Sequence, residues 1–248
     1  MNNYWKSRRP LDCALVMAAG CLGMVAPSAE AALSTYSGSA TLTYTINSIT
    51  NTTNPGNLGD LVVTGFFEQQ GGPASHVITS GDGAVNAANA AFPSAPVTSP
   101  WSHSFTTSGS VTDGVVDASH LGWFSLDFAN QGTDLFNISV TLTYQLDANA
   151  AGESAASLVH LDYFNTSASF SGSADAVASS IAQNVASTPG TSAVFNFSLA
   201  ALGTESLLSD VTITGNLQAS AVPLPAAVWL FGAGLAPLFR LRTRKSAA

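Results

Sequence analysis

The sequence predicts an all-β protein: an antiparallel β-sandwich or jelly-roll-like ectodomain with an N-terminal signal helix and a C-terminal single transmembrane helix. Three observations predict it. The middle of the chain alternates apolar and polar residues with a period of two, which is typical of strands with one buried face. Links rich in glycine, asparagine and serine separate these stretches. Both ends of the chain carry a long apolar segment beside a basic cluster.

Residues 1–31 are expected to be a secretory signal peptide. Basic residues (Lys6, Arg8 and Arg9) precede an apolar stretch from about Leu11 to Val25. The A-x-A site that follows predicts cleavage after Ala31, with Ala29 as its other small residue. A retained anchor helix is the alternative, but the apolar stretch is shorter than the ~20 residues that a membrane span needs.

Both cysteines of the chain, Cys13 and Cys21, fall inside this segment. The mature body would therefore contain neither a disulfide nor a thiolate metal site. Ala18-Ala19-Gly20-Cys21 is partly similar to a bacterial lipobox, so lipidation of Cys21 stays open as an alternative.

Residues 32–221 are expected to form one β domain without internal repeats. The alternation is clearest over residues 136–146, where the apolar positions are Phe136, Ile138, Val140, Leu142, Tyr144 and Leu146. The same period covers residues 41–46 and 211–219. Shorter strands are expected around Leu61–Glu68, Ser102–Val111, Trp123–Phe128, Leu158–Phe164 and Ala193–Leu199. Eight or more strands, each with one face exposed to solvent, favour a sandwich or jelly roll.

Two stretches of the domain fit this pattern less well. Asp82–Phe92 is rich in alanine and is expected to be a short helix or a loop. Ser173–Ser187 has a spacing that fits neither period, so its structure is left open.

The charge of the chain is divided unevenly. All seven Lys and Arg residues lie near the termini, and none lies between Ala32 and Ala221. Of the 15 acidic residues, all but Asp12 and Glu30 fall in that stretch, which leaves 13 and a charge of −13 with neutral histidine. Such a body repels nucleic acid, which is bound through clustered Lys and Arg, and attracts cations.

The C-terminus carries 18 residues without a charge, Val222–Phe239. Pro223 and Pro225 favour an extended backbone at its start, and a helix from Pro225 to Phe239 would be ~21 Å long at 1.5 Å per residue. A basic tail closes the chain: Arg240, Arg242, Arg244 and Lys245. The positive-inside rule places that tail in the cytoplasm and the body outside the inner membrane.

This tail resembles the PEP-CTERM sorting signal of Gram-negative bacteria, in the VPLPA-CTERM variant. The matching motif is Val222, Pro223, Leu224, Pro225 and Ala226, followed by Trp229-Leu230-Phe231-Gly232, Gly234-Leu235 and the basic tail. The resemblance covers about the last 27 residues. Ala233 stands where the family often has Ser, and Pro237 interrupts the second half of the span.

The resemblance implies a partner and a destination. It implies processing by an exosortase near the Pro-x-Pro motif, a transient anchor in the inner membrane, and a cell-surface or extracellular protein linked to exopolysaccharide or biofilm. A permanent C-terminal membrane anchor is the alternative.

The body offers no recognisable catalytic motif. Gly-x-Ser-x-Gly, His-Glu-x-x-His, phosphate loops and dinucleotide fingerprints are all missing from the sequence. His160-Leu161-Asp162 would place two polar side chains on one strand face, which is read as a surface or cross-strand pair. We therefore expect a protein that is not an enzyme; a glycoside-active enzyme using paired carboxylates is the remaining catalytic alternative.

Binding sites are only faintly indicated. Asp113 and Asp117 lie in a turn-like segment and Asp82 lies between two glycines, so these carboxylates are candidate calcium ligands in a protein otherwise expected to need no cofactor. Solvated turn carboxylates are the simpler interpretation. Trp101 and Trp123 are candidates for stacking on sugar rings, or else core aromatics. These features make a carbohydrate-binding module, assisted by calcium or not, the alternative function.

Overall fold

The computed structural model describes residues 32–69, 76–88, 100–167 and 169–220. Residues Ala31–Ala221 form one compact unit. The predicted signal peptide and sorting segment lie outside the described residues. Within the described ranges, no helix is long and apolar enough to cross a membrane.

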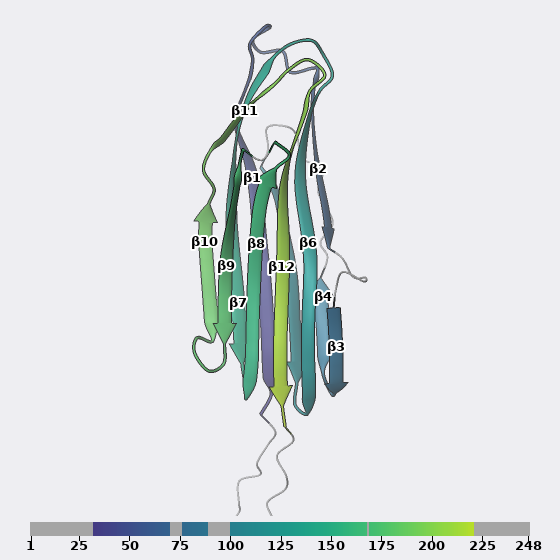
Figure 1. The fold of residues 1–248 in the computed structure, drawn as a ribbon, viewed down its shortest axis with the longest axis vertical. Helices are drawn as coiled ribbons and strands as arrows, with labels where there is room; N and C mark the ends of the chain where they lie inside the picture. Colours follow the sequence, from purple (N-terminus) through teal and green to yellow (C-terminus); the bar gives the residue numbers. More distant parts are fainter. Residues whose placement is uncertain (1–31, 70–75, 89–99, 168, 221–248) are drawn as a thin grey trace, which may run out of the picture. The chain divides into compact units, whose positions relative to one another are not determined.

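The described chain is all β, in two antiparallel sheets (Figure 1). Sheet A has the strand order β10-β7-β1-β5-β4, with β11 also paired to β7, and sheet B the order β2-β6-β12-β8-β9, with β3 also paired to β6. The strands are β1 (Ser34–Asn51), β2 (Leu61–Gln69), β3 (His76–Gly81), β4 (Ala84–Ala88), β5 (Trp101–Val111), β6 (Gly114–Asn130), β7 (Phe136–Ala151), β8 (Ser154–Asn165), β9 (Ser171–Ser179), β10 (Val185–Thr191), β11 (Phe195–Leu199) and β12 (Thr204–Ala219). The prediction of an all-β sandwich is confirmed.

The period of two in the sequence separates core from surface. In β1 the even positions from Tyr36 to Tyr44 are buried, and the odd positions between them are Ser or Thr at the surface. One hydroxyl pair crosses the core: Tyr44 Oη lies 2.7 Å from Ser209 Oγ of sheet B. Burial raises the pKa of Tyr44 above its ordinary value, so this phenol stays neutral and hydrogen-bonded.

Large and small residues alternate across the two sheets. An added Cβ at Gly122 of β6 would lie 2.5 Å from Phe105 Cδ1 of β5, so the glycine makes room for the ring. Gly215 of β12 does the same for the ring of Tyr36 on β1. Phe105 and Tyr36 are almost completely buried. Close approach between the sheets therefore depends on glycine at these two inward-facing positions.

Each side of the sandwich is formed by consecutive strands that pair with different sheets. β3 pairs with β6 of sheet B and β4 with β5 of sheet A, while β9 pairs with β8 of sheet B and β10 with β7 of sheet A. Figure 1 shows these two pairs of strands at opposite sides of sheet B. Thr188 Oγ1 of β10 donates to the Asp175 carbonyl of β9 at 2.8 Å, which joins the two sheets at one edge.

The structure corrects two of the sequence predictions and shows strands in one segment that they left open. Residues 84–88 of the alanine-rich segment form strand β4 rather than a helix or loop, because β5 supplies backbone partners. The open segment Ser173–Ser187 contains most of β9 and the first part of β10. The turn between β5 and β6 ends before Gly114, so Asp117 lies inside strand β6 and not in a turn.

Candidate functional site

The outer face of sheet A is covered with small polar side chains. Alternate residues of β1, β5 and β7 point outward, and residues paired across strands share one face. Thr41 Oγ1 lies 2.8 Å from Ser104 Oγ, and Thr43 Oγ1 lies 2.9 Å from Ser102 Oγ. These pairs form a regular hydroxyl surface over β1 and β5.

Part of this face is hollowed into a groove of about 540 Å³, which we call the sheet A groove. Asn86 of β4 and Val185 of β10 contribute to its lining from the two edge strands. Its floor carries hydroxyl, amide and carboxylate side chains: Ser37, Ser39, Thr106, Ser108, Asp147 and Asn149. A second hollow of about 280 Å³ adjoins it and shares Ser37, Asn86, Ser108 and Asn149. The volume of the sheet A groove lies in the range of small-molecule sites.

Among the described residues, Asp147 is the only charged one that lines the sheet A groove. Its Oδ1 accepts hydrogen bonds from Gln145 Nε2 at 2.8 Å and from Ser187 Oγ at 2.7 Å. Gln145 Nε2 also donates to Ser187 Oγ at 2.6 Å. Two neighbours therefore fix the orientation of this carboxylate, while no hydrogen bond within the described residues reaches its Oδ2.

The lining of the sheet A groove presents hydrogen-bond donors and acceptors and, in the described part of the chain, no cationic side chain. Its central strands pair with neighbours on both sides, so their backbone groups are used within the sheet and recognition falls to side chains. Hydroxyls and amides can both donate and accept, and they suit a ligand that is itself rich in hydroxyls.

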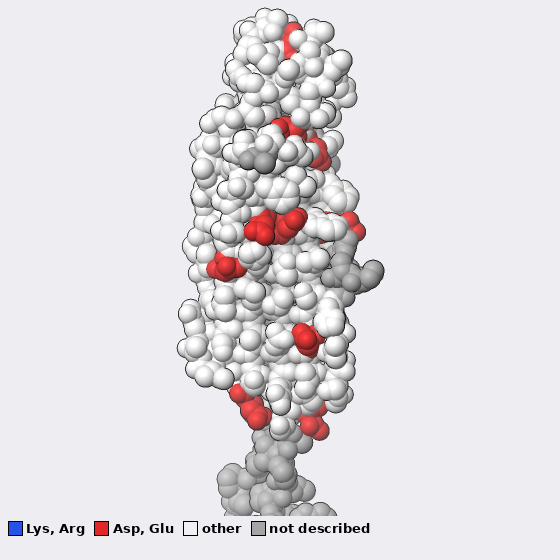
Figure 2. Space-filling model, in the orientation of Figure 1, with Lys and Arg blue, Asp and Glu red and all other residues white. Residues whose placement is uncertain are grey.

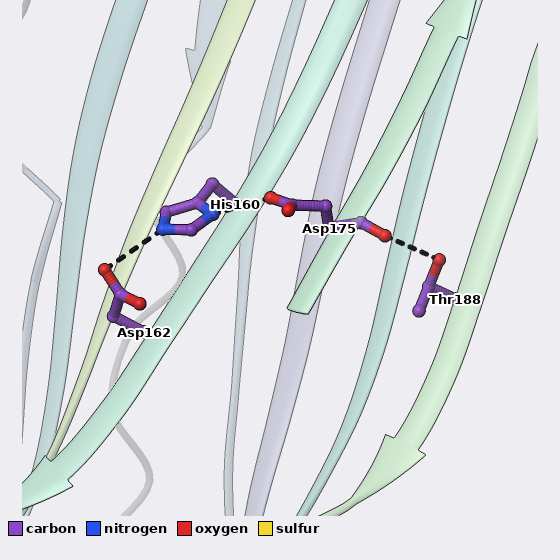
Figure 3. Close-up of polar contacts among 4 residues, drawn as sticks. All are labelled: His160, Asp162, Asp175 and Thr188. Carbon is purple, nitrogen blue, oxygen red and sulfur yellow. Dashed lines mark hydrogen bonds and ion pairs between the residues drawn. The ribbon is translucent and has the colours of Figure 1, made fainter. Parts of the chain in front are cut away.

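A second polar cluster lies on the outer face of sheet B and is centred on His160 of β8 (Figure 3). His160 Nδ1 lies 2.6 Å from Asp175 Oδ1 of β9, and His160 Nε2 lies 3.0 Å from Asp162 Oδ2. The hydrogen bond to Asp175, followed by Asp162, raises the pKa of His160 against the opposing effect of burial. Only the imidazolium can donate to both carboxylates at once.

The prediction of a surface pair at His160 and Asp162 is confirmed, with Asp175 as the cross-strand partner. Both ring nitrogens are engaged by carboxylates, so this histidine offers no free nitrogen to a serine nucleophile. The two carboxylates lie on opposite sides of the ring and do not converge on one point (Figure 3).

An acidic residue and an aromatic residue flank this cluster. In the strand register, Asp210 of β12 lies opposite Asp162 of β8 on one side and opposite Trp123 of β6 on the other. Burial, and then the charge of Asp162, raises the pKa of Asp210. The two tryptophans that were candidates for stacking on sugar rings differ in exposure, 37% for Trp123 and 6% for Trp101. Trp101 is therefore a core residue, and of the two only Trp123 is accessible to a sugar ring. Figure 2 shows this face with scattered acidic residues and no basic ones.

The carboxylates predicted as calcium ligands do not form a common site. Asp82 Oδ1 accepts from the backbone N–H groups of Thr112 and Asp113 at 2.8 and 2.9 Å, and Oδ2 accepts from the Thr112 hydroxyl. The hydroxyl bond and these backbone bonds lower the pKa of Asp82 to about 2. Asp117 lies in β6, 3.8 Å from His76 Nε2. The described ranges contain no group of three His, Cys, Asp or Glu residues that could hold a metal ion.

Sequence reasoning missed the sheet A groove. Its lining includes β4 and β10, the two edge strands that the alternation did not predict. The run of outward Ser and Thr in β1 and β5 was the available signal. Ala29, Ala31, the motif Val222–Ala226 and the basic tail lie outside the described residues, and their roles stay predictions.

Comparison with protein families, with curated proteins and with solved structures finds no match to this chain.

Proposed function

We propose that this chain is an exported, non-enzymatic protein of the cell surface or extracellular matrix of a Gram-negative bacterium, processed at its C-terminus by an exosortase. The observation that carries the proposal is the order of segments in the sequence. A signal-like start, a body without Lys or Arg, a Val-Pro-Leu-Pro-Ala motif, a short apolar span and a basic tail follow one another.

The body is stabilised without disulfides and without Lys or Arg ion pairs. Residues 32–221 contain no cysteine, so no disulfide contributes to stability. They contain no Lys or Arg either, so the two sheets are held by an apolar core and by hydrogen bonds such as Tyr44–Ser209. A charge of −13 keeps copies of such a body apart through repulsion.

The motif is tested by changing Pro223 and Pro225 to Ala together. We expect the full-length chain to accumulate in the inner membrane, because the exosortase acts near these residues. The readouts are membrane fractionation and the intact mass of the recovered protein. Pro237→Ala is the matched control, since it changes a proline of the same tail outside the motif and should mature normally. Identical maturation of all three proteins would contradict the proposal.

A second candidate function is carbohydrate binding, by which the protein would associate with exopolysaccharide. The sheet A groove favours it, because the side chains on its floor carry hydroxyl, amide and carboxylate groups. Affinity electrophoresis through gels containing the organism's exopolysaccharide tests it. Retardation supports the function, loss of retardation with a chelator adds a requirement for calcium, and unretarded migration counts against it.

A further inference from the structure

We infer that the sheet A groove binds an uncharged polysaccharide and excludes uronic-acid polymers, with Asp147 as the residue that determines this specificity. This inference rests on carbohydrate binding, the second candidate function, and names its ligand class and its site.

The first argument is the chemistry of the lining. Six floor residues offer hydroxyl, amide or carboxylate groups, and the edge adds the amide of Asn86. Among the described residues, Val185 is the only large apolar residue that lines the sheet A groove. Binding would therefore depend on many hydrogen bonds to a hydroxyl-rich chain, and an apolar ligand would leave these polar groups unpaired.

The second argument is charge. Lys or Arg would favour the binding of an anionic chain by offsetting its charge, and residues 32–221 contain neither. A uronic-acid carboxylate in the groove would instead meet Asp147 and the overall charge of −13. Repulsion between two carboxylates a few ångströms apart at a protein surface lowers affinity by about tenfold or more.

The third argument is the hydrogen bonding of Asp147. Ser187 and Gln145 both donate to Oδ1, which holds the carboxylate in one orientation. Oδ2 receives no hydrogen bond within the described residues and is available to accept from a sugar hydroxyl. Such a charge-assisted bond is stronger than one between neutral groups.

The test uses the full-length chain in a non-glycosidic detergent, with chelator present. Affinity electrophoresis is run through three neutral polymers (dextran, laminarin and galactomannan) and through polygalacturonate. We expect retardation by at least one neutral polymer and none by polygalacturonate. Asp147→Asn keeps the shape of the side chain and replaces the free acceptor by an amide donor. It should weaken binding of the neutral polymer about tenfold and relieve the exclusion of polygalacturonate.

Two further variants separate binding in the groove from binding elsewhere on the protein and from a general effect of net charge. Ser39→Trp fills the floor and should abolish binding while the circular dichroism spectrum stays unchanged. Asp127→Asn makes the same change of net charge on the outer face of sheet B and should bind neutral polymer like the unmodified protein.

Each failure points to a different conclusion. Binding of polygalacturonate as strong as that of the neutral polymer overturns the inference and leaves carbohydrate binding in place. Binding of neutral polymer that neither Asp147→Asn nor Ser39→Trp alters places the site elsewhere and also overturns it. No retardation by any polymer overturns both the inference and the carbohydrate-binding candidate, and leaves the exosortase proposal untouched.

Discussion

Replacing Gly122 by Ala should destabilise the sandwich, because the new methyl group would collide with the ring of Phe105. The three nearest atoms to a Cβ built at this position all belong to that ring, at 2.5, 2.6 and 3.0 Å. Phe105 is 1% exposed, so the ring has no solvent to move into. Relief would require the two sheets to move apart locally or the ring to leave its rotamer.

The magnitude follows from two opposing effects. Overpacking a core by one methylene or methyl group costs about 1–3 kcal/mol. Replacing Gly by Ala restricts the unfolded chain and returns about 0.4–1 kcal/mol. We therefore expect the free energy of unfolding to fall by about 1–2 kcal/mol. The melting temperature would fall by roughly 2–4 °C for each kcal/mol in a chain of this size.

Urea unfolding followed by tryptophan fluorescence measures the change, and a double-mutant cycle assigns it to the ring. Phe105→Leu replaces the aromatic ring by a smaller side chain and so leaves room for the methyl group that Gly122→Ala adds. Gly122→Ala should therefore cost much less in the Phe105→Leu background, with a coupling energy of about 1–2 kcal/mol. Ser119→Ala, on the outer face of the same strand, is the control and should change stability by less than about 0.5 kcal/mol. Equal costs of Gly122→Ala in both backgrounds would refute the argument that this glycine exists to admit Phe105.

The remaining predictions concern pH. The pKa of His160 is raised in the folded protein, so protonated His160 stabilises the fold. This contribution is fully present below about pH 6.5 and is lost as the pH rises through the raised pKa. The urea midpoints of His160→Asn and of the unmodified protein should therefore converge at alkaline pH. Burial lowers the pKa of His103 and of His120, so the unfolded chain takes up protons first and stability falls as the pH drops below about 6.5. His103→Phe should reduce that loss, and an unchanged pH profile would show that His103 does not cause it. Hydrogen bonds lower the pKa of Asp82 to about 2, so its stabilisation is lost as the pH falls from about 4 towards 2; Asp82→Asn should flatten this part of an acid unfolding curve, and a curve as steep as before would contradict the role of the turn.

The sequence predicted the long central strands well and their ends poorly. Residues 136–146 alternate strongly, but β7 continues to Ala151 with Ala148 and Ala150 as its inward residues. Alanine and glycine face the core where a bulky side chain of the other sheet fills the space, as Gly122 does for Phe105. Such positions carry little hydrophobic signal, so the periodicity fades before the strand ends.

The sequence likewise predicted part of the His160 cluster but not the sheet A groove. The His160–Asp162 pair was predictable because two residues separated by one lie on the same face of any strand. Asp175 and the sheet A groove were not, since both depend on pairing with edge strands that are rich in alanine and serine. Pairing is decided between distant segments, and no single stretch of sequence records it.

The lack of cationic side chains on the body has a practical consequence for anyone handling the protein. No Lys or Arg lies between Arg9 and Arg240, so trypsin has no cleavage site across that whole region. Reagents that react with amines would find no lysine on the sandwich. Peptide identification from a tryptic digest would therefore overlook this protein, and digestion at acidic residues or analysis of the intact chain would detect it.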